Sequence, residues 1–189
     1  RLALGDKLTV GDAIFLVESS GIHANGLTLA RTIASRLKKG YASHLSDGKT
    51  YGESLLAPTH IYAGLTRDYF KEGIDIHYMV NITGHGWRKL MRAKRDFSYI
   101  IEKVPEPQPV FKFIQEQSRN DDQEMYGNFN MGAGFAVFIP EKDVKLAQRI
   151  AKEKYGWQSG KAGYVDRGPR QVIIRPKNLT FRGETLKVR

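Results

Sequence analysis

The chain has 189 residues and no cysteine, which excludes disulfides, thiolate catalysis and cysteine-ligated zinc or iron–sulfur centres. It also has no apolar run near the about 18 residues that a membrane-spanning helix requires. Its first residues contain neither the hydrophobic segment nor the cleavage site of a secretory signal. We therefore expect a cytoplasmic protein without a membrane partner.

Hydrophobic residues make up 41% of the chain and charged residues 26%, as in ordinary globular proteins. A chain of this length can bury about 70% of its unfolded surface around one hydrophobic core. We expect a single domain over residues 1–189. The chain starts at Arg1 rather than at an initiator methionine, so it can be part of a longer protein.

Negative charge is in short supply, because 20 Asp and Glu stand against 30 Lys and Arg and leave a net charge of +10. This excess favours anionic partners. The segment from Lys161 to Arg189 holds eight basic and two acidic residues, but it has no arginine-rich run and no row of aromatic residues for stacking bases. We therefore expect a phosphorylated small molecule, and no nucleic acid, as partner.

The central pattern is an apolar run of strand length, Asp12–Glu18, then a glycine-containing loop, then a helical pattern over Leu27–Lys39 that Gly40 is expected to end. The loop, Ser19–Gly26, has two glycines and two hydroxyls. Backbone N–H groups in such a loop can approach a phosphate closely, and the helix dipole favours its charge. The loop therefore predicts an anion site. The alternative is an ordinary turn in which Asn25 caps the helix.

The same order of features recurs in the strand pattern Ile76–Ile82, the glycine-containing loop Thr83–Gly86 and an expected helix that begins near Trp87. The alternative is again a tight turn, here followed by a solvated basic face. If both loops end strands of one sheet at the same edge, their backbone donors converge on one concave site. We expect this arrangement, with His23 facing the opening.

Elements of both kinds alternate along the rest of the chain, which predicts a mixed α/β (α+β) fold, a layered sandwich with helices covering a mixed sheet. The other expected strands are Phe97–Val104, Phe135–Ile139 and two short ones within Lys161–Arg175; expected helices follow the Thr50–Glu53 capping box, run through Ile61–Phe70 and Val110–Gln117, and begin at Pro140.

Three stretches resemble one family in the same order. SSGIHANG (Ser19–Gly26), LLAPTHIY (Leu55–Tyr62) and EMYGNFNMGAG (Glu124–Gly134) are similar to segments of aminoimidazole ribonucleotide (AIR) synthetase, also called phosphoribosylformylglycinamidine cyclo-ligase. The resemblance runs from about Gly5 to about Ile150 and covers the family's C-terminal domain. It implies that domain's fold for residues 1–189 and an N-terminal ATP-binding domain that is absent from this chain.

The resemblance implies a ligase of purine biosynthesis that uses ATP to close the imidazole ring of aminoimidazole ribonucleotide from formylglycinamidine ribonucleotide. In the family, the N-terminal domain carries the acidic, magnesium-binding part of the ATP site and the dimer interface. ATP and Mg would thus be bound mainly by the missing domain, and no metal site is expected here. The implied partners are the phosphorylated substrate, the protein's own N-terminal domain and a second copy in a homodimer. The chain alone is expected to be inactive.

The resemblance and the loop chemistry together select the candidate site residues. The expected catalytic residues are His23, as a hydrogen-bond donor or proton carrier, and Asn25. The residues expected to bind the substrate or its phosphate are Ser19, Ser20, Gly21 and Gly26 in the first loop, and Thr83, Gly84 and Gly86 in the second. Glu124 and Asn130 are further candidates, for which a structural role is the alternative.

The sequence also departs from the family pattern. Asn81–Gly86 reads NITGHG where the family has HITGGG, Arg88–Leu90 replaces an asparagine-containing segment, and Gly127 and Asn128 stand where Arg and Thr are usual. Two alternatives therefore stay open. One is a sister enzyme of the same ATP-dependent superfamily with another substrate, such as thiamine phosphate or selenide. The other is a non-catalytic module that binds an anion or a partner.

Overall fold

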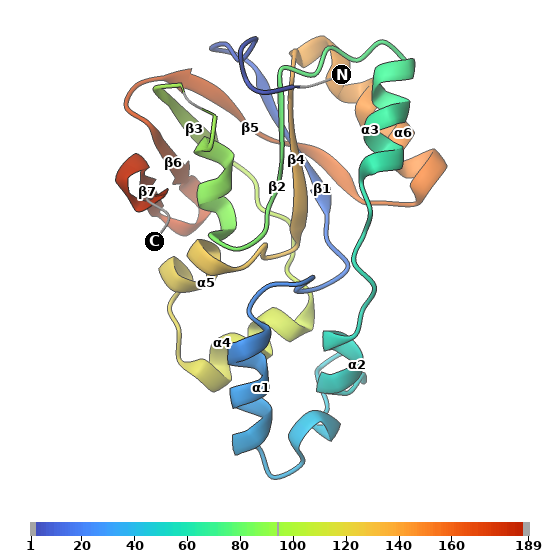
Figure 1. Cartoon of the computed structure of the whole chain (residues 1–189), viewed down its shortest axis with the longest axis vertical. Helices are drawn as coiled ribbons and strands as arrows, with labels where there is room; N and C mark the ends of the chain where they lie inside the picture. The colour runs from blue at the N-terminus through green and yellow to red at the C-terminus, as the bar shows by residue number, and fades with distance from the viewer. Residues whose placement is uncertain (1–2, 94, 187–189) are drawn as a thin grey trace.

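A single curled sheet organises the computed structural model, which describes residues 3–93 and 95–186 (Figure 1). Within these ranges the strand order is β2-β4-β1-β5-β3-β6-β7. The strands are β1 (Ala13–Glu18), β2 (Tyr78–Asn81), β3 (Phe97–Ile101), β4 (Ala133–Ile139), β5 (Ser159–Arg167), β6 (Gln171–Ile174) and β7 (Leu179–Arg182). Neighbours are antiparallel except β3 and β6, which are parallel. The predicted mixed sheet is confirmed.

Helices cover this sheet, as the sequence predicts. The helices α3 (Ala63–Lys71) and α6 (Val144–Tyr155) pack together on one side, whereas α1 (Leu27–Arg36), α2 (Tyr51–Leu55) and α4 (Pro109–Ser118) form a helical end beyond the C-terminal end of β1 (Figure 1). The other helical segments are α5 (Asp122–Asn128) and the 3₁₀ helices η1 (Gly40–Ala42), η2 (Gly86–Met91), η3 (Glu141–Asp143), η4 (Arg175–Lys177) and η5 (Gly183–Leu186). No helix in the described ranges is long and apolar enough to span a membrane.

Strand β1 separates two hydrophobic clusters, because successive side chains of a strand point to opposite faces of the sheet. Ile14 and Leu16 belong to the cluster that includes residues of α1, α4 and η2. Phe15 and Val17 belong to the cluster that includes residues of α3 and α6. The continuous apolar run that predicts this strand is therefore explained by burial on both faces.

The helix after the first loop is shorter than predicted. α1 ends at Arg36, and Leu37 follows with extended backbone (ψ 138°) and a half-buried side chain that packs against the core. This packing favours the early end of the helix, since it removes apolar surface from water. Lys38 and Lys39 lie beyond the helix. Gly40 has a left-handed φ of 52°, but it begins η1 instead of ending α1.

Other expectations are partly confirmed and partly wrong. The capping box is confirmed, since the N–H of Glu53 donates to Thr50 Oγ1 and the N–H of Thr50 donates to the Glu53 carboxylate. Ile61 is expected on the buried face of a helix, but it precedes α3 and is 78% exposed. The second loop leads into η2, a six-residue 3₁₀ helix, rather than into an α-helix. The sequence patterns do not predict α5 or β7.

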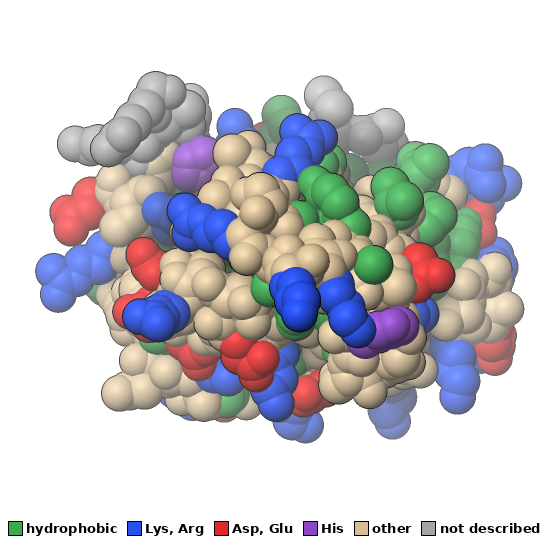
Figure 2. Space-filling view, turned by 90° about the horizontal axis from the view of Figure 1, so that it is seen from below, with side chains coloured by type: hydrophobic (Ala, Val, Ile, Leu, Met, Phe, Trp, Pro, Cys, Tyr) green, Lys and Arg blue, Asp and Glu red, His purple; other side chains and the backbone are tan. Residues whose placement is uncertain are grey.

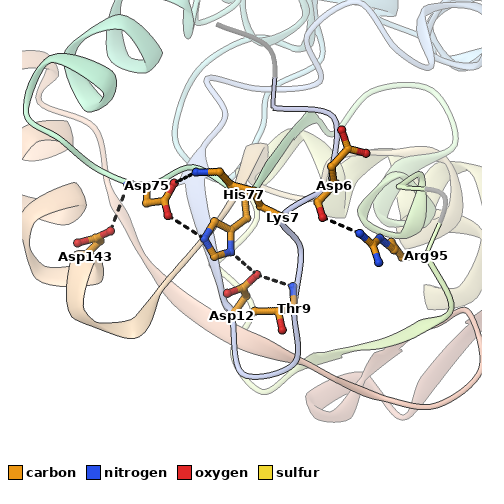
Figure 3. Close-up of polar contacts among 8 residues, drawn as sticks. All are labelled: Asp6, Lys7, Thr9, Asp12, Asp75, His77, Arg95 and Asp143. Atoms are coloured by element: carbon orange, nitrogen blue, oxygen red, sulfur yellow. Dashed lines mark hydrogen bonds and ion pairs between the residues drawn. The ribbon is translucent and has the colours of Figure 1, made fainter.

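A polar cluster around His77 fastens the N-terminal segment to the sheet and to α6 (Figure 3). His77 Nδ1 lies 2.8 Å from the carboxylate of Asp12, and Nε2 lies 3.2 Å from that of Asp75. Lys7 pairs with Asp75 at 2.6 Å, and Asp143 accepts a hydrogen bond from the Asp75 N–H. These contacts tie together the starts of β1 and β2, the two strands that lead into the candidate loops.

Candidate functional site

The two glycine-containing loops meet at one edge of the sheet. β1 and β2 flank β4 and are both antiparallel to it, so they run in the same direction and end at the same edge. The loops Ser19–Gly26 and Thr83–Gly86 start there. A Cβ placed on Gly84 would lie 3.4 Å from Oδ1 of Asn25, which shows that the loops touch. The predicted meeting of the two loops at one edge of the sheet is confirmed, although the N–H groups of Ser19, Asn25 and Gly86 donate within the fold.

A groove of about 1530 Å³ lies beside these loops, along the edge strand β2 and between α3 and η2. The loops contribute His23, Asn25 and Thr83 to its lining; other polar lining residues are His60, Tyr62, Thr66, Arg67 and Lys71 along the α3 side, Asn81 of β2, and Lys89 and Arg92 on the η2 side. Its described lining contains no Asp or Glu. The groove is thus suited to a negatively charged ligand.

Asn130 holds the first loop from beneath. Its side chain is fully buried, Oδ1 accepts from Ser19 Oγ at 2.8 Å and from the Gly132 N–H at 3.0 Å, and Nδ2 donates to the Gly21 carbonyl at 2.9 Å. Ser19 is 1% exposed, and Gln108 Nε2 donates to its carbonyl. The structure therefore places Ser19, Gly21 and Asn130 below the groove and not in its lining.

The backbone of Ser20 orients the imidazole of His23. The Ser20 N–H donates to His23 Nε2 at 3.2 Å, and the Ser20 hydroxyl donates to the Pro58 carbonyl at 2.6 Å. His23 has a left-handed φ of 56° and lines the groove, as predicted. Because Nε2 accepts a hydrogen bond, the proton of the neutral ring belongs on Nδ1. Nδ1 bonds to no described residue and is available as a donor to a ligand.

His23 is kept neutral by its surroundings. Burial, and secondarily the nearby His60, lower the pKa of His23 from 6.5 to about 4. The two imidazole centroids are 6.3 Å apart, and His60 stacks on Trp157 with centroids 4.7 Å apart. Burial also lowers the pKa of His60. At neutral pH, His23 is therefore a hydrogen-bond donor with no stored proton to transfer as an acid.

Gly26, and not Asn25, is the N-cap of α1. Its φ is 71°, and no side chain caps the helix. A Cβ on Gly26 would lie 2.0 Å from Cε1 of Phe129, so only glycine fits between the loop and this buried ring. Asn25 is thereby released from capping, and its side chain faces the second loop.

The second loop combines an open half and a packed half. Thr83 lines the groove and Gly84 lies against Asn25. Gly86 is buried with a φ of 50°, and a Cβ there would lie 2.1 Å from the carbonyl oxygen of Tyr126. Gly86 therefore permits close packing of η2 on α5, while Thr83 faces the groove and Gly84 faces Asn25.

Residues 9–175 match the family described as "AIR synthase related protein, C-terminal domain". The chain belongs to this family. This agrees with the resemblance seen in the three sequence stretches, and it covers the groove and both loops.

Two relatives that share one name match most of this AIR synthase-related chain. It is 41% identical over 152 residues to a "Phosphoribosylformylglycinamidine cyclo-ligase" of Methanococcus maripaludis, covering 80% of this chain and 43% of the relative. It is 40% identical over 155 residues to the protein of that name from Methanocaldococcus jannaschii, covering 81% of this chain and 44% of the relative. The chain thus spans less than half the length of these relatives.

Solved structures agree with the fold of the AIR synthase-related domain. The hydrogenase maturation protein HypE from E. coli superimposes with a TM-score of 0.61 at 14% identity, over 96% of this chain and 52% of that chain. T. maritima PurL, solved in complex with FGAR, superimposes with a TM-score of 0.54 at 16% identity, over 93% of this chain and 28% of that chain. At these identities the likeness concerns the fold alone.

Some groove residues of this AIR synthase-related domain are absent from the sequence-based candidates. His60 and Tyr62 lie within the LLAPTHIY stretch, which carries the family resemblance and could have indicated them. Arg67 on α3 lies outside the three stretches that resemble the family. Conversely, Glu124 is exposed on the first turn of α5 and does not line the groove. Within the described ranges no group of three or more His, Asp or Glu is arranged to hold a metal ion.

Proposed function

We propose that this chain is the C-terminal half of an ATP-dependent cyclo-ligase that converts formylglycinamidine ribonucleotide into aminoimidazole ribonucleotide. The names of the two relatives at 41% and 40% identity support this reaction. Since the chain spans only 43% and 44% of those relatives, we assign the rest of the active site to an N-terminal ATP-binding domain. The same proposal includes a homodimer of the full-length protein and a cytoplasmic location.

One observation carries the proposal: two loops at the ends of parallel strands meet beside a groove without carboxylates, with a neutral histidine in its lining. Such a groove favours an anionic, phosphorylated ligand, and fixed donors in it stabilise charge that develops on oxygen. The loops are held by buried contacts, so their donors need little reorganisation on binding.

In the proposed reaction an amidine nitrogen attacks the formyl carbon, and the former formyl oxygen leaves as phosphate. ATP would supply the phosphoryl group that makes this oxygen a leaving group. Nδ1–H of His23 would donate to the formyl or phosphoryl oxygen, the Asn25 amide would orient the amidine, and Thr83 and Gly84 would bind a phosphate. Gly26 keeps Asn25 in position, Ser19, Ser20 and Gly21 would support the first loop, and Gly86 would support the second by close packing.

The described residues do not fit a magnesium site. No group of three or more His, Asp or Glu among them is arranged to hold a metal ion, and the described groove lining has no carboxylate, the ligand type that Mg²⁺ prefers. We therefore assign Mg, together with most contacts to ATP, to the N-terminal domain.

The test is an ADP-release assay on the full-length protein that contains this chain, with formylglycinamidine ribonucleotide, thiamine phosphate and selenide as separate substrates. We expect release with the first only, and His23→Ala should lower turnover by about 10²- to 10³-fold, as for loss of one fixed hydrogen-bond donor. Lys38→Ala, an exposed change beyond α1, is the control and should leave turnover unchanged. Release with another substrate would identify a sister enzyme instead.

The proposal that this chain carries only part of the active site has its own test. The 189-residue chain, supplied with magnesium, ATP and formylglycinamidine ribonucleotide, should not turn over. Turnover by this chain alone would contradict the assignment of ATP and Mg binding to a second domain.

A further inference from the structure

Three basic residues lie in η2 or directly after it, and they differ in their contacts: Arg88 bonds within the fold, whereas Lys89 and Arg92 do not. Arg88 donates to the carbonyls of Gly127, His85 and Thr185, with the shortest distance 2.6 Å. The side chains of Lys89 and Arg92 form no hydrogen bond and no ion pair with any described residue, although both line the groove. The guanidinium of Arg88 is thus bonded within the fold, whereas the charged groups of Lys89 and Arg92 have no bonded partner among the described residues.

Lys89 and Arg92 form an unfavourable pair when no ligand is present. Lys89 is half-buried, and burial together with the charge of Arg92 lowers its pKa. Charged side chains removed from water are normally paired with an opposite charge. Here two like charges lie together with no carboxylate partner among residues 3–93 and 95–186. An anion between them would relieve the repulsion.

The opposite wall of the groove carries the same sign. Arg67 and Lys71 are spaced i and i+4 on α3, so they lie on one face of that helix, and both line the groove. The side chain of Lys71 forms no hydrogen bond or ion pair with any described residue, whereas Arg67 lies 3.8 Å from Asp68 and also interacts with the Tyr155 hydroxyl. Elsewhere charges are mixed: on the helical end, Lys and Arg alternate with Asp and Glu over the face (Figure 2).

The segment that presents Lys89 and Arg92 is rigidly held. Trp87 Nε1 donates to the Asn130 carbonyl at 2.9 Å, and Arg170 Nε donates to the Met91 carbonyl at 2.8 Å. Asn130 also fixes the first loop, so one residue sets the position of η2 relative to His23. Cations held at a constant distance from a reactive centre can bind one end of a ligand and so position its other end for reaction.

We propose that Lys89 and Arg92 form a subsite for the phosphate monoester of the substrate, faced across the groove by Arg67 and Lys71, while the reacting end lies at His23. The lysine supplies a compact charge and the guanidinium a fork that matches phosphate oxygens. That the ligand is a phosphate monoester rests on the proposed function. The subsite falls in the Arg88–Leu90 segment and its continuation, where this sequence departs from the family pattern.

The experiment measures binding of ribose 5-phosphate to the full-length protein by isothermal titration calorimetry, with ribose as the uncharged comparison. Ribose 5-phosphate should bind much more tightly than ribose. Lys89→Ala and Arg92→Ala should each weaken it by about tenfold, and Lys89→Arg should retain most of the affinity. In turnover assays the same variants should raise KM more than they lower kcat. Unchanged affinity in the double variant would overturn the subsite.

Matched controls separate this subsite from general electrostatics and from the proposed reaction. Lys38→Ala removes the same charge outside the groove, and an equal loss of affinity there would overturn the proposal. His23→Ala should lower turnover by about 10²- to 10³-fold yet keep ribose 5-phosphate binding. If the wild type binds ribose 5-phosphate through Lys89 but does not cyclise formylglycinamidine ribonucleotide, the reaction is wrong and the subsite stands. Lys89→Ala should not lower the thermal unfolding temperature, because its side chain has no bonded partner in the described chain and its removal relieves the repulsion with Arg92.

Discussion

Ser19 and Asn130, 111 positions apart in the sequence, share a buried hydrogen bond of 2.8 Å between Ser19 Oγ and Asn130 Oδ1. The same amide binds the Gly21 carbonyl and the Gly132 N–H, and the Asn130 carbonyl accepts from Trp87 Nε1. One fully buried residue therefore fixes the base of the first loop and the start of η2. This explains how loops distant in sequence keep a constant separation.

Asn130→Leu should destabilise the domain strongly, because it leaves the Gly21 carbonyl and the Gly132 N–H buried without their partner. We expect a loss of about 2 to 5 kcal/mol in the free energy of unfolding, measured by urea denaturation. Ser19→Ala removes one hydroxyl from the same network and should cost about 1 kcal/mol. Equal losses in the two variants would contradict the central position given to the amide.

Gly26→Ala should be costly because a Cβ at this position would lie 2.0 Å from the Phe129 ring. Steric overlap and the left-handed backbone together should cost about 2 to 5 kcal/mol. Gly73→Ala is the matched control, since Gly73 has a φ of 79° and no atom of another described residue within 4 Å of its Cβ position, and it should cost about 1 to 2 kcal/mol. In a Phe129→Ala background, the cost of Gly26→Ala should fall to that of the control.

The sequence is informative where one local pattern decides the structure. β1 and β4 are continuous apolar runs that are buried on both faces, and the Thr50–Glu53 spacing forms the capping box it predicts. The convergence of the two loops could be predicted because two strand–loop patterns at one sheet edge suffice for it. The family resemblance then identified which loop residues to consider.

The remaining features depend on contacts between distant segments and leave no local pattern. Gly26 and Gly86 look like residues of phosphate loops, but each is required by close packing, against Phe129 and against the Tyr126 carbonyl. The hydroxyl of Ser19 turns inward because Asn130 lies beneath it. Arg67 enters the groove only because α3 lies alongside β2. Periodicity alone specifies none of these.

Ile33 and Leu37 share a helical face in the sequence pattern, but the structure gives them different environments. Ile33 is 3% exposed within α1, whereas Leu37 is half-buried beyond the helix end. Ile33→Ala should therefore cost about 2 to 5 kcal/mol of unfolding free energy, and Leu37→Ala about half as much. Urea denaturation of the two variants compares them directly. A larger loss for Leu37→Ala would indicate that the helix continues beyond Arg36.

His23 should make the stability of the chain depend on pH. Its pKa is lowered from 6.5 to about 4 in the folded chain, by burial and then by His60, so between these values the unfolded chain binds a proton that the folded chain does not. The free energy of unfolding should therefore rise with pH across this window, by at most about 1.4 kcal/mol per pH unit for one proton, and be lost as pH falls through it. His23→Gln should flatten this dependence in urea denaturation at pH 4.5, 5.5 and 7. In NMR titrations, His60→Ala should raise the pKa of His23, and a pKa near 6.5 in the unmodified chain would contradict the buried, neutral donor.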